Sequence, residues 1–257
     1  EHANYLNDPF YLGATCGRVS NRINHASFEL DGEQIHVNKN HGEHCLHGGQ
    51  ENFALQYWQV ITELTKSSEI TLQHSSKDGD AGFPGQVDIM VRYHLSEDNK
   101  LSIHYHANTS KPTPINVTNH SYFSLGEDTC LNLGLEIDAD AYLDVDDEGI
   151  PTGVALPTAA SDFSFNKEAV IGQNQQQASH PQLQAPLGYD HCYVLKNKTL
   201  TTPSAMLTSQ LNNIRMSLYT DHEALQLYTG SFLATPFTPY QGVCLEAQSY
   251  IDAVNNK

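Results

Sequence analysis

The sequence predicts an all-β protein built as a large antiparallel β-sandwich. Three observations support this fold class. Apolar residues almost never recur at helical spacing, short strand-like runs recur along the whole chain, and Asn, Asp, Gly and Pro bound those runs. Tight turns join the runs, without the helical segments that parallel βαβ units need. We therefore expect antiparallel strands in packed sheets.

Two hairpins stand out among the predicted strands. Ala26–Val37 contains an Asp31-Gly32 turn, which is typical of a hairpin. Val87–Leu95 alternates apolar and polar residues, so this strand should have one buried face, and Glu97–Lys100 predicts a turn into the strand Leu101–Ala107. The other predicted strands are Trp58–Leu64, Ile70–His74, Ile115–Val117, Leu133–Ile137, Cys192–Leu195, Ala205–Leu211, Ile214–Tyr219, Ala224–Tyr228 and Gly242–Gln248.

One domain is expected over residues 1–257, a length that can bury a sizeable core. The polar stretch Gln173–Gln184 predicts a long loop, but it does not divide the chain. The sequence leaves the oligomeric state open.

Net charge excludes two classes of partner. Thirteen Lys and Arg against 30 Asp and Glu give a net charge of −17, which repels phosphate backbones and anionic lipid. No run approaches the roughly 18 apolar residues of a membrane span. We therefore expect no nucleic-acid partner and no membrane partner.

The cysteines and the first residues predict a cytoplasmic protein. The five cysteines are an odd, scattered set without a CxxC pair, which argues against a disulfide scaffold. The first residues lack the basic and apolar regions of a secretory signal.

Histidine is the unusual component, with 14 residues. His41, His44 and His47 have the spacing that would gather metal ligands on one helix face, but the neighbouring glycines disfavour a helix and favour a loop with one functional histidine. His104 and His106 lie on one side of a predicted strand. A metal-binding β-barrel shows such a pair, and so does the polar face of an exposed strand.

Motifs for nucleophilic hydrolysis and for phosphate loops are absent, since the chain has no GxSxG and no GxxxxGK[ST]. Instead, five short polar islands interrupt strand-like sequence. Hydrogen-bonding groups at strand ends are half-buried, where their pKa values can move, and a cleft lined by them suits a neutral polyhydroxylated ligand. The islands are Gly17–Ile23, Leu46–Gly49, Asn116–Phe123, Tyr189–His191 and Cys244–Gln248.

Read in order, these motifs resemble the aldose 1-epimerase family, the galactose mutarotases. Eight matching segments span nearly the whole chain, which makes the resemblance specific. It implies a galactose mutarotase-like β-sandwich and a free aldose as the small-molecule substrate, with no metal and no other cofactor. The matching segments are Gly17–Ile23, Leu46–Gly49, Asp78–Gly85, Asn119–Phe123, Ile150–Gly153, Tyr189–His191, Gln226–Gly230 and Leu245–Gln248.

The resemblance also implies residue roles. Glu246 matches the family's general base and His120 its general acid, which together would open and close the sugar ring at C1. For that acid role the imidazole must be charged near neutrality, and we expect carboxylates such as Asp190 to raise its pKa. Residues that match the family's sugar-binding positions are Asn21, Arg22, His47, Asp190 and Gln226.

Aromatic neighbours of the motifs can serve either the sugar or the core. Phe83, Tyr122 and Phe123 are candidates for stacking on a sugar face, and core packing is the ordinary alternative.

The chain also departs from the family. It begins shortly before the first motif and ends soon after the last, so we expect terminal strands of the family sandwich to be missing. Ser124 and Ala247 stand where the family more often has Asn and Thr.

Three alternatives to a mutarotase of free galactose or glucose stay open. The first is a sugar-binding module without turnover, against which the presence of both Glu246 and His120 weighs. The second is a hexose-6-phosphate 1-epimerase, which the scarcity of basic residues beyond Arg18 and Arg22 disfavours. The third is the metal-dependent barrel built on His104 and His106.

Overall fold

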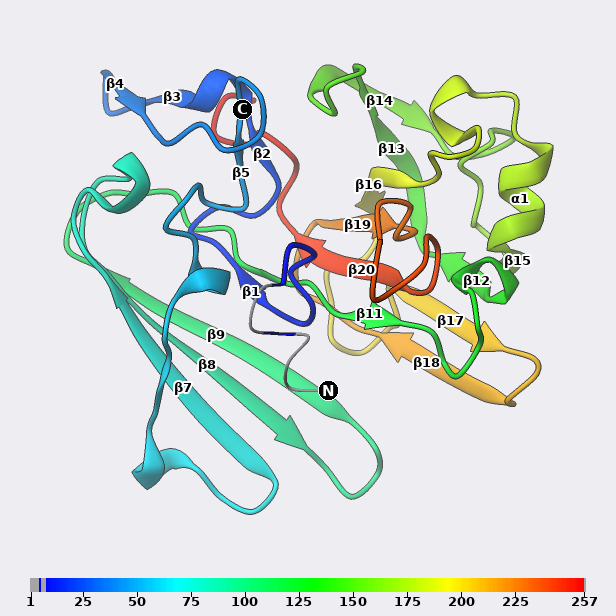
Figure 1. Cartoon of the computed structure of the whole chain (residues 1–257), viewed down its shortest axis with the longest axis horizontal. Helices are drawn as coiled ribbons and strands as arrows, with labels where there is room; N and C mark the ends of the chain where they lie inside the picture. The colour runs from blue at the N-terminus through cyan, green and yellow to red at the C-terminus, as the bar shows by residue number, and fades with distance from the viewer. Residues whose placement is uncertain (1–4, 6–7, 257) are drawn as a thin grey trace. The chain divides into compact units, whose positions relative to one another are not determined.

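A computed structural model describes Tyr5 and residues 8–256, and strands far outnumber helices among the regular elements of this part of the chain (Figure 1). The described chain falls into two compact units. The larger unit holds the described residues up to Thr15 together with Thr118–Asn256, and the smaller unit holds Cys16–Val117. β1 (Thr15–Cys16) crosses a boundary between the units along the chain, because Thr15 belongs to the larger unit and Cys16 to the smaller one. The single-domain prediction stays a prediction.

Two antiparallel sheets form the larger unit. The first has six strands in the order β11-β20-β19-β16-β13-β14, and the second has four in the order β15-β12-β17-β18. In the six-stranded sheet the strands are β11 (Tyr122–Phe123), β20 (Val243–Gln248), β19 (Ala224–Tyr228), β16 (Asp190–Leu195), β13 (Ala139–Val145) and β14 (Pro151–Pro157). In the four-stranded sheet they are β15 (Ala169–Val170), β12 (Gly134–Ile137), β17 (Ala205–Ser209) and β18 (Ile214–Leu218). The unit's remaining elements are β10 (Thr118–Asn119), α1 (Ile171–Gln177) and the 3-10 turns Cys130–Asn132 and Pro181–Leu183.

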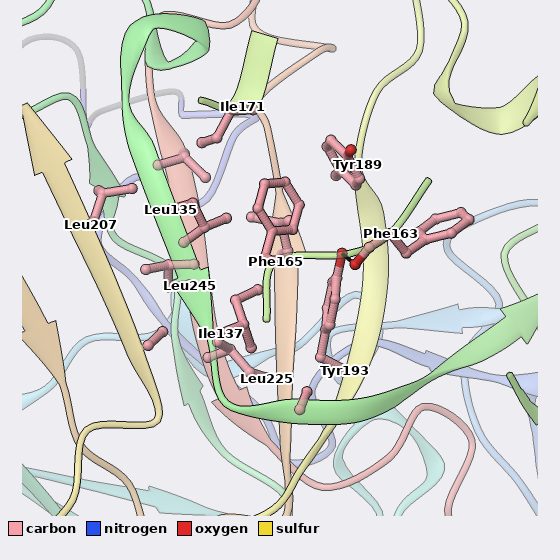
Figure 2. Packing of buried hydrophobic residues seen from close by; sticks show 14 of the residues in the cluster. Leu135, Ile137, Phe163, Phe165, Ile171, Tyr189, Tyr193, Leu207, Leu225 and Leu245 are labelled. Carbon is pink, nitrogen blue, oxygen red and sulfur yellow. Dashed lines mark hydrogen bonds between the residues drawn. The ribbon is translucent and has the colours of Figure 1, made fainter. Parts of the chain in front are cut away.

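The core of the larger unit lies between these sheets. Figure 2 shows Leu135 and Ile137 of β12 directed toward Leu225 of β19 and Leu245 of β20. All four side chains are buried. Apolar faces of two antiparallel sheets packed on each other make a β-sandwich, as the sequence predicts.

The smaller unit holds a four-stranded antiparallel sheet in the order β6-β7-β8-β9. Its strands are β6 (Gln59–Val60), β7 (Glu69–Ser76), β8 (Val87–Leu95) and β9 (Leu101–Thr109). Two short strand pairs complete the unit, β2 (Arg22–Ile23) with β5 (Cys45–Leu46) and β3 (Ser27–Leu30) with β4 (Glu33–His36). Its 3-10 turns are Asn24–Ala26, Phe53–Leu55, Thr62–Leu64 and Asp80–Gly82.

Both predicted hairpins are confirmed. β3 and β4 pair around the Asp31-Gly32 turn, with Leu30 opposite Glu33. β8 and β9 pair along their whole length, with Leu95 opposite Leu101. Alternate residues of β8 from Val87 to Val91 are buried, because only one face of this strand packs on the core.

Three predictions of secondary structure were wrong. Gln173–Gln184 is not one long loop, since most of α1 and a 3-10 turn lie within it. Ile115–Val117 forms no strand and Trp58–Leu64 keeps only the two residues of β6, because loops and a 3-10 turn replace the extended backbone.

None of the helices in the described part of the chain has the length and apolarity to cross a bilayer.

Candidate active site

A row of polar side chains covers the outer face of β20. Val243 and Leu245 point into the core, so Cys244, Glu246 and Gln248 point to the opposite face of the sheet. All three are buried, at 0%, 2% and 0% exposure. A face that buries polar residues in succession along one strand is the first sign of a site, because such groups cost free energy unless they have a use or a partner.

The strand register places further site residues on this face. Gln226 of β19 lies opposite Glu246, and Tyr228 lies opposite Cys244. On the next strand, Asp190 lies opposite Tyr228. Paired residues of antiparallel strands point to the same side of the sheet, so these side chains share one surface.

His120 and Glu246 lie close together in the site. The imidazole Nε2 lies 3.7 Å from Glu246 Oε1, and both side chains are almost completely buried. The backbone of His120 is held on both sides, since its N–H donates to the Ala14 carbonyl at 2.9 Å and its carbonyl accepts from the Gly13 N–H at 3.0 Å. The other ring nitrogen, Nδ1, lies 3.5 Å from Cys244 Sγ.

Burial sets the charge state of His120. Desolvation lowers the imidazole pKa to about 4, and the charges of Asp190 and Asp8 oppose this shift without reversing it. The expectation that nearby carboxylates raise the pKa of His120 was therefore wrong in its net direction, although Asp190 does act in the expected sense. His120 is neutral near pH 7 in the sugar-free protein.

Asp190 and Gln226 form a second pair beside the carboxylate of Glu246. The amide Nε2 of Gln226 donates to Asp190 Oδ1 at 2.7 Å. Gln226 is 1% exposed, and among the described residues its Oε1 has no hydrogen-bond partner. This oxygen is therefore an acceptor for a ligand that brings its own donor.

Aromatic rings surround His120 within the larger unit. The centroid of its ring lies 5.2 Å from that of Tyr122, 6.4 Å from that of Tyr228 and 5.8 Å from that of Tyr11. Of the three aromatic candidates from the sequence, Tyr122 alone lies beside His120. Phe123 packs against the core of the larger unit, and Phe83 is fully buried against Phe28 in the smaller unit.

The remaining predicted site residues gather in the smaller unit. The N–H of Asn21 donates to His47 Nδ1 at 3.2 Å, and the N–H of His47 donates to the Asn21 carbonyl at 3.0 Å. Asn21 Oδ1 also accepts from the backbone N–H and from Nη1 of Arg22. Because Nδ1 of His47 is an acceptor, its proton is on Nε2, which makes this atom a donor.

The loop after His47 needs a glycine. Gly48 has a φ of +95°, and a Cβ there would lie 2.1 Å from the Gly17 carbonyl oxygen. Only a residue without a side chain allows these two backbone segments to approach so closely, and this approach holds His47 beside Asn21.

Neither the trio His41, His44 and His47 nor the pair His104 and His106 belongs to a set of three close ligands in the described part of the chain. Over the described residues, one set of three potential ligands has its donor atoms within 4.8 Å of one another, and it consists of His120, Cys244 and Glu246. His44 instead accepts a hydrogen bond from the backbone N–H of His25. His104 and His106 lie on the exposed side of β9, as the exposed-strand interpretation predicts.

Cys244, Tyr228 and Gln248 lie within the predicted motifs, but the sequence predicted no site role for them. The alternation of β20 contained the signal for two of them, because Cys244 and Gln248 stand two residues before and after Glu246. Tyr228 comes next to this group through the register between β19 and β20. That register is not visible in the sequence.

Comparisons with known proteins identify the family. The model of the family described as aldose 1-epimerase matches residues 1–257. Aldose 1-epimerase of Haemophilus influenzae is 38% identical, over 98% of this chain and 76% of that protein. Human galactose mutarotase is 34% identical, over 98% of this chain and 74% of that protein.

Solved structures agree with the sequence matches. An aldose epimerase homologue from C. elegans has a TM-score of 0.91 at 27% identity and covers 100% of this chain and 78% of that one. Galactose 1-epimerase from Lactobacillus acidophilus has a TM-score of 0.88 at 28% identity, over 99% of this chain and 76% of that one. These likenesses confirm the mutarotase-like β-sandwich. The chain belongs to the aldose 1-epimerase family and is an enzyme of the isomerase class.

Proposed function

We propose that this chain interconverts the α and β anomers of a free hexose such as galactose or glucose. The observation that carries the proposal is the pair formed by Glu246 and His120, whose carboxylate and imidazole lie 3.7 Å apart on one buried face of a sheet. Two proton-transfer groups at this separation suit a reaction in which one oxygen loses a proton while a neighbouring oxygen gains one.

Anomer exchange needs that pair of transfers. Glu246 takes the proton of the C1 hydroxyl as the bond between C1 and the ring oxygen breaks, and His120 gives a proton to the ring oxygen. The open aldehyde turns about the C1–C2 bond. The reverse transfers then close the ring on the other face of C1, so protons and electrons balance over the cycle.

The reactive form carries a proton on His120. Burial makes this form a minor one in the sugar-free protein near pH 7. A single proton serves both side chains. It can sit on His120, with Glu246 as carboxylate, or on Glu246, with His120 neutral, and the net charge of the pair is the same in both forms. The charge of Asp190 also favours the imidazolium form.

We assign the sugar hydroxyls to the polar groups around this pair. Gln226 Oε1 offers an acceptor, and Asp190 holds the amide so that this oxygen is available. Asn21, Arg22 and His47 are assigned to substrate binding from their motifs, with the guanidinium of Arg22 and the Nε2 proton of His47 as donors. Hydrogen bonds that replace water are worth about 1 kcal/mol each, so modest affinity is expected.

One of the two arginines that could bind the phosphate of a hexose 6-phosphate has a structural role instead. The guanidinium of Arg18 is buried and donates to the carbonyl oxygens of Lys77, Pro84 and Gly85 and to Ser76 Oγ. Arg18 is therefore a structural group of the smaller unit, and Arg22 is left as the one arginine of this motif that could meet an anion. A neutral sugar is the better match.

The cytoplasm remains the proposed compartment. All five cysteines are buried and none of them forms a disulfide, which suits a reducing environment.

Polarimetry of freshly dissolved α-D-galactose tests the function and both catalytic roles. The wild type should speed the decay of optical rotation over an enzyme-free blank, while Glu246→Gln and His120→Asn should each lose about 10²-fold or more. Glu97→Gln, in the exposed turn after β8, is the matched control and should keep wild-type activity.

Sugar binding, measured by calorimetry on the same variants, separates the alternatives. Wild-type protein that binds galactose without speeding anomer exchange would identify a sugar-binding module. Faster exchange with glucose 6-phosphate than with galactose or glucose would identify a hexose-6-phosphate epimerase.

A further inference from the structure

Three different metal donors meet at the proposed catalytic pair. The imidazole of His120, the thiol of Cys244 and the carboxylate of Glu246 offer one ligand atom each, and these atoms lie within 4.8 Å of one another. Nitrogen, sulfur and oxygen together form a donor set that Zn²⁺ accepts and that Mg²⁺ and Ca²⁺ do not prefer.

One pair of these donors already has the spacing of metal ligands. Cys244 Sγ lies 3.5 Å from His120 Nδ1. A tetrahedral zinc ion with bonds of about 2.3 Å to sulfur and about 2.0 Å to nitrogen separates these two atoms by about 3.5 Å. All three donor atoms lie within 4.8 Å of one another, and rotation about the side-chain bonds of Glu246 can bring its carboxylate closer to the other two.

The backbone holds the three ligands before a metal arrives. Cys244 and Glu246 are two residues apart on β20, so the sheet directs both to the same face. Backbone hydrogen bonds to Gly13 and Ala14 hold His120.

We propose that His120, Cys244 and Glu246 form an inhibitory site for Zn²⁺ and similar thiophilic divalent cations. The inhibition rests on the proposed function, because a metal ion at this site holds the carboxylate of Glu246 and keeps the His120 ring from taking the second proton that imidazolium needs. Three protein ligands leave the fourth position of the ion to water. Because the C1 hydroxyl and the ring oxygen of the sugar must contact Glu246 and His120 themselves, Zn²⁺ and the sugar exclude each other, and the metal raises the apparent KM for the aldose.

Direct metal binding tests the site without any sugar. Co²⁺, added to the metal-free wild type, should give the intense absorption band of a cobalt–thiolate bond, and Zn²⁺ should remove that band at one equivalent per chain. Cys244→Ala should lose the band and weaken Zn²⁺ binding by at least about 10-fold. Cys192→Ala is the matched control, because Cys192 is a fully buried thiol of the same sheet outside the ligand set, and it should keep the band.

Kinetics then test the inhibition. In polarimetry of galactose, Zn²⁺ should raise the apparent KM of the wild type, EDTA should restore it, and Mg²⁺ should have no effect. Each variant is compared with its own rate without metal. In Cys244→Ala the Zn²⁺ concentration for half-inhibition should increase by the same factor as the dissociation constant.

The two proposals can fail separately. A cobalt–thiolate band that depends on Cys244, in a protein without mutarotase activity, would support the metal site and overturn the proposed function. A wild type that is active but shows no such band up to millimolar Co²⁺ would overturn the metal site, and so would equal Zn²⁺ inhibition of wild type and Cys244→Ala.

Discussion

Gln226 donates its side-chain amide to Asp190 across the β16–β19 strand pair, at 2.7 Å. This bond decides which end of the Gln226 amide is turned away from Asp190, because a carboxylate can only accept. The free oxygen of Gln226 is thus an acceptor beside Glu246, which lies opposite Gln226 on β20. We therefore expect Asp190 to act on a bound sugar through Gln226, as a positioning residue.

Asp190→Ala should weaken sugar binding more than it slows the chemical step. Without the carboxylate, the Gln226 amide turns freely, and one well-placed hydrogen bond to the sugar is lost. We expect KM for galactose to rise about 10-fold, which corresponds to about 1.4 kcal/mol. Steady-state polarimetry gives KM and kcat separately. Asp147→Ala, in an exposed turn, is the control, and an unchanged KM in Asp190→Ala would contradict the positioning role.

The rate of the reaction should increase as the pH falls. Burial lowers the pKa of His120 to about 4, so the imidazolium fraction of the free protein grows nearly 10-fold for each pH unit between 8 and 5. We expect kcat/KM to follow that increase, because it reports groups of the free enzyme. Polarimetry corrected for the blank at each pH measures it. A flat profile with chemistry rate-limiting would contradict imidazolium as the acid.

Acid should destabilise the protein through His191. This residue is buried on the core side of β16, against Phe163, and donates to Gln182 Oε1. Desolvation lowers its pKa to about 4 from 6.5, so between these pH values the unfolded chain binds the proton first. Stability is retained above pH 6.5 and is lost as the pH falls toward 4, by up to about 3 kcal/mol.

Urea unfolding at pH 7.5 and pH 4.5 measures this loss. His191→Gln removes the titrating group and keeps an amide donor toward Gln182, so the difference in unfolding free energy between the two pH values should shrink by about 2–3 kcal/mol. The comparison of variant with wild type cancels the contribution of the carboxylates. A variant that loses as much stability as the wild type would refute the assignment.

Gly48→Ala should destabilise the smaller unit strongly. Its new Cβ would meet the Gly17 carbonyl at 2.1 Å, so the backbone would have to shift, at a cost of about 3 kcal/mol or more. Gly32→Ala is the matched control, because Gly32 has a similar φ of +83° with nothing within 4 Å, and it should cost only about 1–2 kcal/mol. Equal losses in urea unfolding would show that close approach at Gly48 is unimportant.

Sequence patterns predicted strands well where the pattern was local. β8 and its partner β9 were visible because alternating burial leaves a period of two in the sequence. The hairpin of β13 and β14 was missed, since Asp140, Asp144 and the Asp146–Glu148 turn mask its alternation and Pro151 opens β14. Proline is tolerated there because β14 is an edge strand.

Helix α1 was missed for the opposite reason. Its sequence from Ile171 to Gln177 is almost wholly polar, so no apolar stripe marks it. Ile171 and Gly172, at its first turn, are buried, and Ile171 joins the core cluster. Contact with the rest of the unit stabilises a segment that its own composition does not favour.

The order of the motifs was enough to name the family, its fold class and the candidate pair Glu246 and His120, because these are properties of residue identity and spacing. The charge of His120 could not be predicted from the sequence. Burial lowers its pKa while the charges on Asp190 and Asp8 raise it, and the balance depends on how deeply the folded chain buries the ring. The contact between Cys244 and His120 could not be predicted either, because these residues are 124 positions apart and meet only when β11 pairs with β20. Residue types therefore set which chemistry is available to this chain, and the packing of strands decides the protonation state and the neighbours with which that chemistry operates.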